Sequence, residues 1–598
     1  MKALKKAFAL VLVLAIVMSL SITAFAADTG KIKLVNTVAD TNVSIIDQKF
    51  DAYKLFDLTV AEKNGAKSYN YTLNADFEAF LAAYNLKHFG ETDAGKKKYL
   101  TEDALITAVS GYTDKGAEIA AFAKEALEWA TGSAKGAYPN AAARVNPTQS
   151  AAGKKINETT EAALLDALPL GYYLVSAKAL DGQQTLVASC ATATTDMDAV
   201  VEIPLKLEAP KAAKAIVEGT SDVKGTAAGV GDTVNFKVTS KVPNMFAFDT
   251  YQFAIVDTMT EGLTLNTAAD KFAVTIGGKK VNVVTTTAGA TQPYAVLSAT
   301  TGGFTLSFGD SDLKTVIAEI NKTADPDITT GAEIKVTYSA VVNGDAVSHY
   351  EEVNDVCVRY SNDPSDPSKT TDDKKVPHEK TYNYDFSMDI LKYAYNSVAP
   401  TDQTNVLSGA QFALYKEVTS EAGTKKQYYS ADETTGLTVT WVEEAAEGVV
   451  PEDATIRTSQ INGKLDKAFL GLDAGIYYLV ETAAPDGYAK LNQPVKVVIT
   501  PDYNADGTLK SCKFAVTNPE SKAQNKTSEV NLTKTELDAL HTGEADSQIT
   551  LVANIANNSG KVLPTTGGMG TTIFYTVGAI LMVSALVLLI TKKKMSVN

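Results

Sequence analysis

Two charged residues in the last third of the sequence continue apolar strand faces and could together do acid–base chemistry. Lys392 continues the alternate apolar positions of 386–390, and Glu481 continues those of 477–479. Residues two apart in a strand share one face, so both charges are expected to be buried, which is costly unless they are paired or neutralised. Burial lowers the pKa of an amine and raises that of a carboxyl group. The pair would therefore place a neutral, nucleophilic amine beside a protonated acid.

A second pair of the same types stands earlier in the chain. Lys214 shares a face with Ile216, and Asp257 shares one with residues 253 and 255. Asparagines also continue apolar faces, and the amine could attack an amide there while the acid polarises its carbonyl group, with loss of ammonia. The candidate amides are Asn362 for Lys214, with Asn354 as the alternative, and Asn557 for Lys392, with Asn518 as the alternative.

Short runs of alternating apolar and polar residues, bounded by Gly, Asp, Asn and Pro, make up most of the chain. This pattern is typical of the strands of all-β sandwiches. The segment 76–129 differs, because alanine-rich stretches such as 117–129 have the spacing of amphipathic helices. A chain of 598 residues is too long for a single core. We expect a mainly β fold of several domains, with helical insertions in the first.

Both ends of the chain have the features of targeting segments. Residues 1–26 combine a basic start, an apolar run and a small-x-small ending, so we predict a signal peptide cleaved after Ala26. Near the other end, an apolar run at 573–590 and the lysines at 592–594 indicate a membrane-spanning helix with a cytoplasmic tail. The pentapeptide before that run is Leu563-Pro564-Thr565-Thr566-Gly567. Together these features resemble the LPxTG cell-wall sorting signal that sortases process.

Internal similarity and three further motifs extend the resemblance. The sequence FDAYK at 50–54 mirrors FALYK at 412–416, so the first and last domains look related. The segment GIYYLVETAAPDGY at 475–488 resembles the E-box of sortase-assembled pilins. The segments VGDTV at 230–234 and DTMTEGL at 257–263 are similar to those of middle pilin domains. Over nearly its whole mature length, the chain resembles the backbone pilins of Gram-positive sortase-assembled pili.

The resemblance implies tandem immunoglobulin-like (CnaB-like) β-sandwiches that are cross-linked internally by Lys–Asn isopeptide bonds. It also implies the following division: signal peptide 1–26, N-terminal pilin domain 27–205, middle pilin domain 206–382, C-terminal CnaB-like domain with the E-box 383–562, and sorting signal with membrane segment and basic tail 563–598. The two Lys/acid/Asn sets described above are the expected cross-links of the last two domains. In the first domain Ser176 and Asn36 replace the acid and the lysine, so no such bond is expected there.

The resemblance further implies polymerisation by acyl transfer, in which this chain is the substrate. A sortase cysteine would attack the carbonyl group of Thr566, and a lysine of the next subunit would receive the acyl group. We predict Lys206 as that lysine, with Lys211 as the alternative, because both lie just before Lys214 and near a proline. The implied partners are copies of this chain, pilus-type and housekeeping sortases, peptidoglycan, and minor pilins or host ligands.

Other functional classes have less support. The net charge of −15 argues against nucleic acid as a partner. The segment 502–507 imitates the start of an EF-hand loop, but Lys513 stands where the bidentate Glu is required. We expect no metal, no cofactor and no enzymatic turnover beyond single intramolecular bonds. The alternatives to a structural shaft subunit are a monomeric wall-anchored adhesin and a minor pilin.

Overall fold

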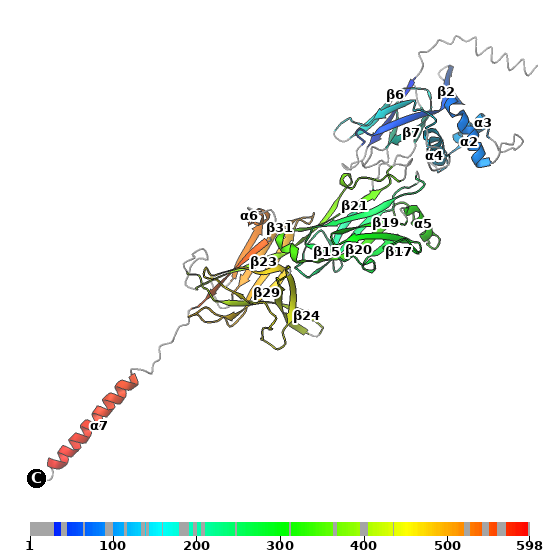
Figure 1. Ribbon diagram of the computed structural model, residues 1–598. Helices are drawn as coiled ribbons and strands as arrows, with labels where there is room; N and C mark the ends of the chain where they lie inside the picture. Colours follow the sequence, from blue (N-terminus) through cyan, green and yellow to red (C-terminus); the bar gives the residue numbers. More distant parts are fainter. Residues whose placement is uncertain are drawn as a thin grey trace, which may run out of the picture.

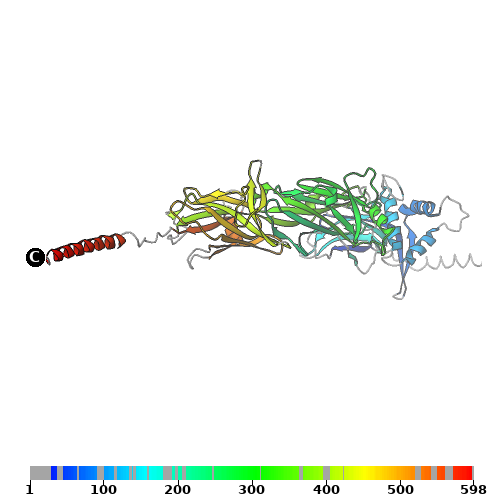
Figure 2. The same ribbon diagram turned by 90° about the horizontal axis from the view of Figure 1, so that it is seen from below.

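The computed structural model describes residues 29–595 except for 37–44, 64–65, 90–99, 113–116, 133–137, 139–142, 158–159, 179–190, 195–199, 205–209, 246–247, 310–311, 363–367, 395–404, 422, 435, 519–526, 541–548 and 559–569. The fold is mainly β, as predicted. Three groups of sheets lie in a row, and one long helix stands at the end of that row (Figures 1 and 2).

The first group of sheets is formed by residues 29–204. One sheet has the order β5-β6-β1-β9, and the other has the order β3-β2-β7-β8 with β4 also paired to β2. The strands are β1 (Thr29–Asn36), β2 (Lys49–Lys63), β3 (Ala66–Leu73), β4 (Gln149–Ala152), β5 (Lys154–Lys155), β6 (Glu161–Pro169), β7 (Gly171–Lys178), β8 (Ala191–Thr194) and β9 (Val200–Pro204).

The helical insertion predicted for this part of the chain is confirmed between β3 and β4. It contains η1 (Ala75–Phe77), α2 (Glu78–Phe89), α3 (Glu102–Gly111) and α4 (Ala117–Thr131). The hydroxyl group of Thr101 accepts a bond of 3.2 Å from the amide of Ala104 and so caps α3. Phe80 of α2 packs against Phe122 and Trp129 of α4, in a hydrophobic cluster that also contains Leu55 of β2 and Leu174 of β7. The helices therefore extend the first group of sheets without entering the middle one.

Residues 213–384 form the middle group, which has two layers. The strand order is β11-β10-β13-β20-β16-β17-β18-β19-β14-β21-β22-β12, with β15 paired to β20. The layers join at β17, which pairs with β16 on one side and with β18 on the other. The elements are β10 (Ala213–Glu218), β11 (Ser221–Val223), β12 (Gly225–Ala227), β13 (Thr233–Lys241), β14 (Phe253–Met259), β15 (Leu263–Leu265), η2 (Ala269–Lys271), β16 (Ala273–Ile276), β17 (Lys279–Val284), β18 (Tyr294–Thr300), β19 (Gly303–Phe308), α5 (Leu313–Asn321), β20 (Glu333–Val342), η3 (Gly344–Ser348), β21 (Glu352–Tyr360), η4 (Asp373–Lys375) and β22 (Glu379–Tyr384).

Residues 386–557 form the third group, which has a three-stranded and an eight-stranded sheet. Their orders are β28-β23-β33 and β26-β25-β24-β29-β30-β31-β32, with β27 paired to β24. The elements are β23 (Phe386–Ala394), β24 (Gln411–Ser420), β25 (Gly423–Asp432), β26 (Thr438–Glu443), β27 (Arg457–Thr458), β28 (Lys464–Leu472), β29 (Gly475–Ala483), β30 (Val495–Tyr503), β31 (Leu509–Thr517), β32 (Thr527–Thr533), α6 (Lys534–Leu540) and β33 (Ile549–Asn557). The segment that imitates an EF-hand loop is the turn between β30 and β31, where the amide of Asn504 donates to the carbonyl group of Thr508.

The middle and third groups of sheets share one hydrophobic cluster, which extends from Ala212 to Ile555. At their junction the ring of Tyr384 stacks on that of Tyr503, with centroids 5.8 Å apart. The hydroxyl group of Tyr384 accepts a bond of 2.9 Å from the amide of Leu509. Because both aromatic and backbone groups are paired across the junction, these two parts of the chain are expected to move together.

The last helix, α7 (Gly570–Met595), follows the third group of sheets. Its segment Phe574–Lys593 has 20 residues with a mean hydropathy of 2.3, and none of it is buried against the rest of the chain. A helix of this length is about 30 Å long, the thickness of a bilayer core. The predicted C-terminal membrane helix is thus present as a separate element (Figure 1).

Candidate cross-linking sites

The third group of sheets brings together Lys392, Glu481 and Asn557. Strands β23 and β33 are parallel neighbours, with Lys392 opposite Ile555. Asn557 lies two residues beyond Ile555 and therefore on the same face of the sheet. Glu481 comes from β29 in the other sheet. The lysine and the asparagine thus share one layer of the sandwich, and the acid faces them from the other.

The three side chains form a closed hydrogen-bonded set. The Nζ atom of Lys392 lies 2.5 Å from Oδ1 of Asn557 and 3.3 Å from Oε1 of Glu481. The amide nitrogen of Asn557 donates to both oxygens of Glu481, at 2.9 and 3.1 Å. No side chain of the three is more than 2 % exposed. An amine, an amide and a carboxyl group that are buried at these distances have the contacts that amide exchange requires.

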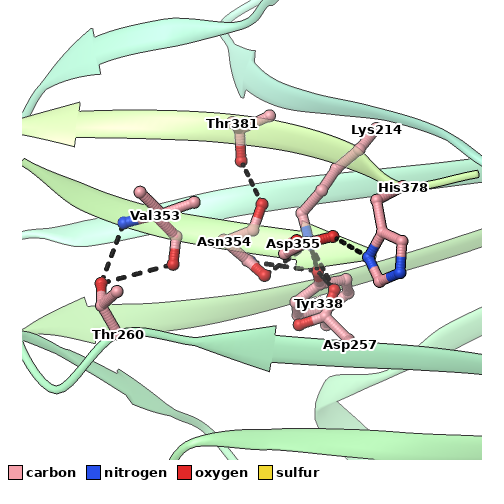
Figure 3. A network of polar contacts seen from close by, with 9 residues as sticks. All are labelled: Lys214, Asp257, Thr260, Tyr338, Val353, Asn354, Asp355, His378 and Thr381. Atoms are coloured by element: carbon pink, nitrogen blue, oxygen red, sulfur yellow. Dashed lines mark hydrogen bonds and ion pairs between the residues drawn. The ribbon is translucent and has the colours of Figure 1, made fainter. Parts of the chain in front are cut away.

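The middle group of sheets contains a second set, with a different distribution over its strands. Lys214 comes from β10, whereas Asp257 and Asn354 come from the neighbouring strands β14 and β21 of the facing layer. Figure 3 shows the three side chains pointing toward one another. Here the acid and the asparagine belong to one layer of the sandwich, and the lysine side chain reaches them from the other layer.

The amine of Lys214 contacts both partners directly. It forms an ion pair with Asp257 and lies 2.5 Å from Oδ1 of Asn354. Lys214 and Asp257 are each only 1 % exposed, and Asn354 is fully buried. Burial lowers the pKa of Lys214 to about 8, although Asp257 acts in the opposite direction. Burial also raises the pKa of Asp257. Both shifts favour the neutral amine and the protonated acid that nucleophilic attack needs.

Asn362 does not lie at this site. Asn362, which the sequence analysis favoured over Asn354, lies beyond the end of β21, and its backbone amide donates to the carbonyl group of Lys369. The register explains the difference, because Asp257 pairs with Val356. Asn354 is two residues from Val356, whereas Asn362 is six residues away, which is about 20 Å along a strand. Asn354 is the amide that meets the pair.

Asn518, the alternative partner of Lys392, lies next to the third-domain site. It is buried at the end of β31, and its amide nitrogen donates to the carbonyl group of Ala556 at 3.3 Å. This bond is to the residue before Asn557, so Asn518 supports the backbone of β33. The structure brings Asn557, and not Asn518, into hydrogen-bond contact with Glu481.

The sequence analysis did not identify Tyr338, whose hydroxyl group also lies in the middle-domain set. Tyr338 is on β20, where Ile334, Val336 and Tyr338 alternate on one buried face. The same alternation that indicated Lys214 and Asp257 therefore contained the signal for this residue. Aromatic rings also contact both amines, since Nζ of Lys214 is 5.5 Å from the ring centroid of Phe236 and Nζ of Lys392 is 5.4 Å from that of Phe412.

The first group of sheets is built differently around the corresponding residues. Ser176 pairs in register with Asp51, and the amide nitrogen of Asn36 donates to Glu161 at 3.2 Å. Glu161 also accepts the backbone amide of Ile45. Among the described residues of 29–204, no lysine is fully buried. The expectation that this domain has no Lys–Asn bond therefore stays a prediction with consistent geometry.

Several predicted residues lie outside the described part of the chain. These are the cleavage site at Ala26, the acceptor candidate Lys206 and the sorting motif from Leu563 to Gly567. The alternative acceptor, Lys211, is described and is exposed just before β10, where its carbonyl group accepts a bond of 2.6 Å from Ser240. Within the described residues, no group of three or more His, Cys, Asp or Glu side chains is placed to hold a metal ion.

Comparisons with known proteins agree with the sequence motifs. Residues 396–513 match the family described as SpaA, prealbumin-like fold domain, and residues 555–596 match the LPXTG cell wall anchor motif. No curated protein sequence matches the chain. The second match, together with α7, identifies a surface protein anchored to the cell wall, whose precursor is held transiently in the membrane.

Several solved pilin structures are similar to the chain at low identity. The T6 backbone pilin of Streptococcus pyogenes is 16 % identical, with 89 % of this chain and 99 % of that one covered and a TM-score of 0.45. The major pilin SpaD of Corynebacterium diphtheriae is 16 % identical, with 89 % and 98 % covered and a TM-score of 0.39. The pilus 2b backbone protein of group B streptococcus is 21 % identical, with 59 % and 99 % covered and a TM-score of 0.35. The chain thus carries a SpaA-type prealbumin-like domain and an LPXTG cell wall anchor motif.

Proposed function

We propose that this chain is the shaft subunit of a covalent pilus, stabilised by two autocatalytic Lys–Asn isopeptide bonds. The observation that supports this most strongly is the pair of buried Lys/acid/Asn sets in a chain that ends in an LPXTG anchor. Buried charged sets of this kind are costly to maintain. Covalent bonds that remove the charge of the lysine would relieve that cost.

The proposed bonds join Lys392 to Asn557 and Lys214 to Asn354. In each, the acid first takes a proton from the amine, so that the amine is neutral. The nitrogen then attacks the amide carbon, the new C–N bond forms, and the old amide nitrogen leaves as ammonia. One amine hydrogen ends on the ammonia and one on the carboxyl group, so atoms and charge balance.

The positions of these bonds suit a subunit under tension. In a shaft, force would enter at the acceptor lysine and leave at Thr566, in a head-to-tail contact that does not close. With both bonds present, the load passes through 206–214, 354–392 and 557–566. It bypasses most of both sandwiches, since the bonded residues are 140 and 165 positions apart. The first domain precedes Lys206 and lies outside the loaded path, which gives a reason to expect no cross-link there.

The proposed domains are those expected from the sequence, 27–205, 206–382 and 383–562. Polymerisation joins Thr566 of one subunit to Lys206 of the next, with Lys211 as the alternative acceptor. The exposure of Lys211 keeps that alternative open.

The test of this function is an immunoblot of wall extracts boiled in detergent, from cells with the parent chain, Lys206→Ala or Lys211→Ala. A ladder of high-mass species that is lost in Lys206→Ala and kept in Lys211→Ala is the expected result. A ladder lost only in Lys211→Ala would move the acceptor to that residue. A single band for the parent chain would instead favour a monomeric wall-anchored adhesin.

A further inference from the structure

The two candidate sites differ in how the acid reaches the amide that must leave. Glu481 accepts the amide nitrogen of Asn557 directly, with both of its oxygens. The shorter Asp257 does not do so in the structure. Its Oδ2 atom accepts Lys214 and Tyr338, and its Oδ1 atom has no hydrogen-bond partner among the described residues. The middle site therefore lacks the acid–amide contact of the third-domain site.

The hydroxyl group of Tyr338 connects the acid to the amide instead. It donates to Oδ2 of Asp257 at 2.5 Å and accepts the amide nitrogen of Asn354 at 3.2 Å. The amine of Lys214 also lies within 2.8 Å of it. Figure 3 shows this hydroxyl group among the three reacting side chains.

We propose that Tyr338 is a catalytic residue of the middle-domain cross-link, which carries the proton from Asp257 to the leaving nitrogen of Asn354. The inference rests on the proposed Lys214–Asn354 bond. Attack by Nζ makes the amide carbon tetrahedral, and its nitrogen becomes basic. Tyr338 gives its proton to that nitrogen while Asp257 gives its own to the Tyr338 oxygen. The C–N bond to the amide nitrogen then breaks, ammonia leaves, and the spare proton of Nζ returns to Asp257.

The surroundings of Tyr338 suit this role. Its ring stacks on Phe236 and Phe272, with centroids 5.4 and 5.7 Å away, so the hydroxyl group is held in place. Burial raises its pKa well above 10, and the nearby Asp257 adds to the shift. The hydroxyl group therefore keeps its proton until a stronger base forms beside it. A neutral donor that also accepts is what a relay between two groups requires.

The inference is tested by comparing Tyr338→Phe with Tyr360→Phe in the full mature chain. Tyr360 is a matched control, because it is also fully buried in the middle domain and its hydroxyl group has no hydrogen-bond partner among the described residues. Protein is collected at intervals after a short pulse of expression and quenched in denaturant. Intact mass counts the ammonia lost, and peptide mapping assigns each loss. The Lys392–Asn557 bond in the same molecule serves as an internal clock.

Tyr338→Phe is expected to form the Lys214–Asn354 bond about 100-fold more slowly than the parent, as for the loss of a general acid. Tyr360→Phe and the internal bond should be unaffected. Parental rates in Tyr338→Phe would overturn the role of Tyr338. A parent chain without a bond at Lys214 would overturn the proposed cross-link itself.

A second variant separates chemistry from folding. In Asp257→Glu/Tyr338→Phe the longer acid is expected to reach the amide directly, as Glu481 does, so the bond should form faster than in Tyr338→Phe. A double variant that resists trypsin like the parent, yet forms the bond as slowly as Tyr338→Phe, would contradict the relay.

Discussion

Replacing Asn557 by alanine should remove the third-domain cross-link and leave its lysine and acid in place. In the structure the amide of Asn557 contacts both Lys392 and Glu481. Without it the amine has no carbon to attack. The variant chain should therefore be heavier by one unreleased ammonia than the parent, after allowing for the substitution itself. Peptide mapping should show that the loss of ammonia is abolished in the segment 383–562 and unchanged elsewhere in the chain.

The magnitude follows from the span of the bond. The two residues are 165 positions apart, and the loop-closure relation used for disulfides gives about 5 kcal/mol for a cross-link of that span. The middle and third domains, which share one hydrophobic cluster and are expected to unfold together, have about 350 residues and an unfolding entropy of about 0.7 kcal/mol/K, so their common Tm should fall by about 7 °C. Loss of the buried amide bonds adds about 1–3 kcal/mol.

A control removes that second contribution. Asn518→Ala deletes a buried amide in the same region, where it donates to Ala556, but should leave the cross-link intact. The difference in Tm between Asn557→Ala and Asn518→Ala therefore isolates the covalent bond. It is measured by calorimetry on the mature chain, alongside intact mass.

The reasoning would be refuted if Asn557→Ala still lost ammonia within 383–562. It would also be refuted if Asn518→Ala abolished that loss, which would make Asn518 the partner. A cross-link that disappears with no change in Tm relative to Asn518→Ala would contradict the stability argument alone.

Three further outcomes are expected. Gly507 has a φ of 91°, and a Cβ there would lie 2.4 Å from backbone atoms of Lys224. Gly507→Ala should therefore lower the free energy of unfolding by about 1–3 kcal/mol and split the calorimetric transition that the last two domains share. An unchanged single transition would contradict the shared junction. Burial lowers the pKa of His378, but hydrogen bonds to Asp355 and a backbone carbonyl group outweigh it and raise the pKa. The stability that protonated His378 contributes is fully present below about pH 6.5 and is lost as the pH rises through the raised pKa. His378→Gln should therefore lower the Tm more at about pH 5.5 than at about pH 8.5. A larger decrease at the higher pH would contradict the raised pKa. Thr566→Ala should leave the chain in the membrane fraction; its release into a covalent wall fraction would exclude Thr566 as the acyl donor.

Much of the fold could be predicted because it depends on local patterns. The strand Thr233–Lys241 alternates buried and less buried residues along its length, and the same period identified Lys214 and Lys392 as members of buried faces. The alanine-rich helices were visible for the same reason, since α4 has the period of a helix with one apolar side.

The partner of Lys214 could not be predicted with the same certainty, because it depends on register between distant strands. Asn354 and Asn362 share one face of the sequence 352–362, and only the pairing of β21 with β14 shows which of them lies near Asp257. Tyr338 was missed because a tyrosine on a buried face is ordinary core, and its hydroxyl group gains meaning only when Lys214, from another strand, lies beside it. The amine and the amide of the two sets are 140 and 165 positions apart, and no local period records such a distance.

The most direct test of the central claim is mass spectrometry of peptides released from the boiled, high-mass wall polymer. The proposed function predicts a branched peptide in which the carboxyl group of Thr566 is joined to the side chain of Lys206, or of Lys211, from another copy of this chain. A polymer in which Thr566 is found only on peptidoglycan amines would contradict it and leave a wall protein that stands alone.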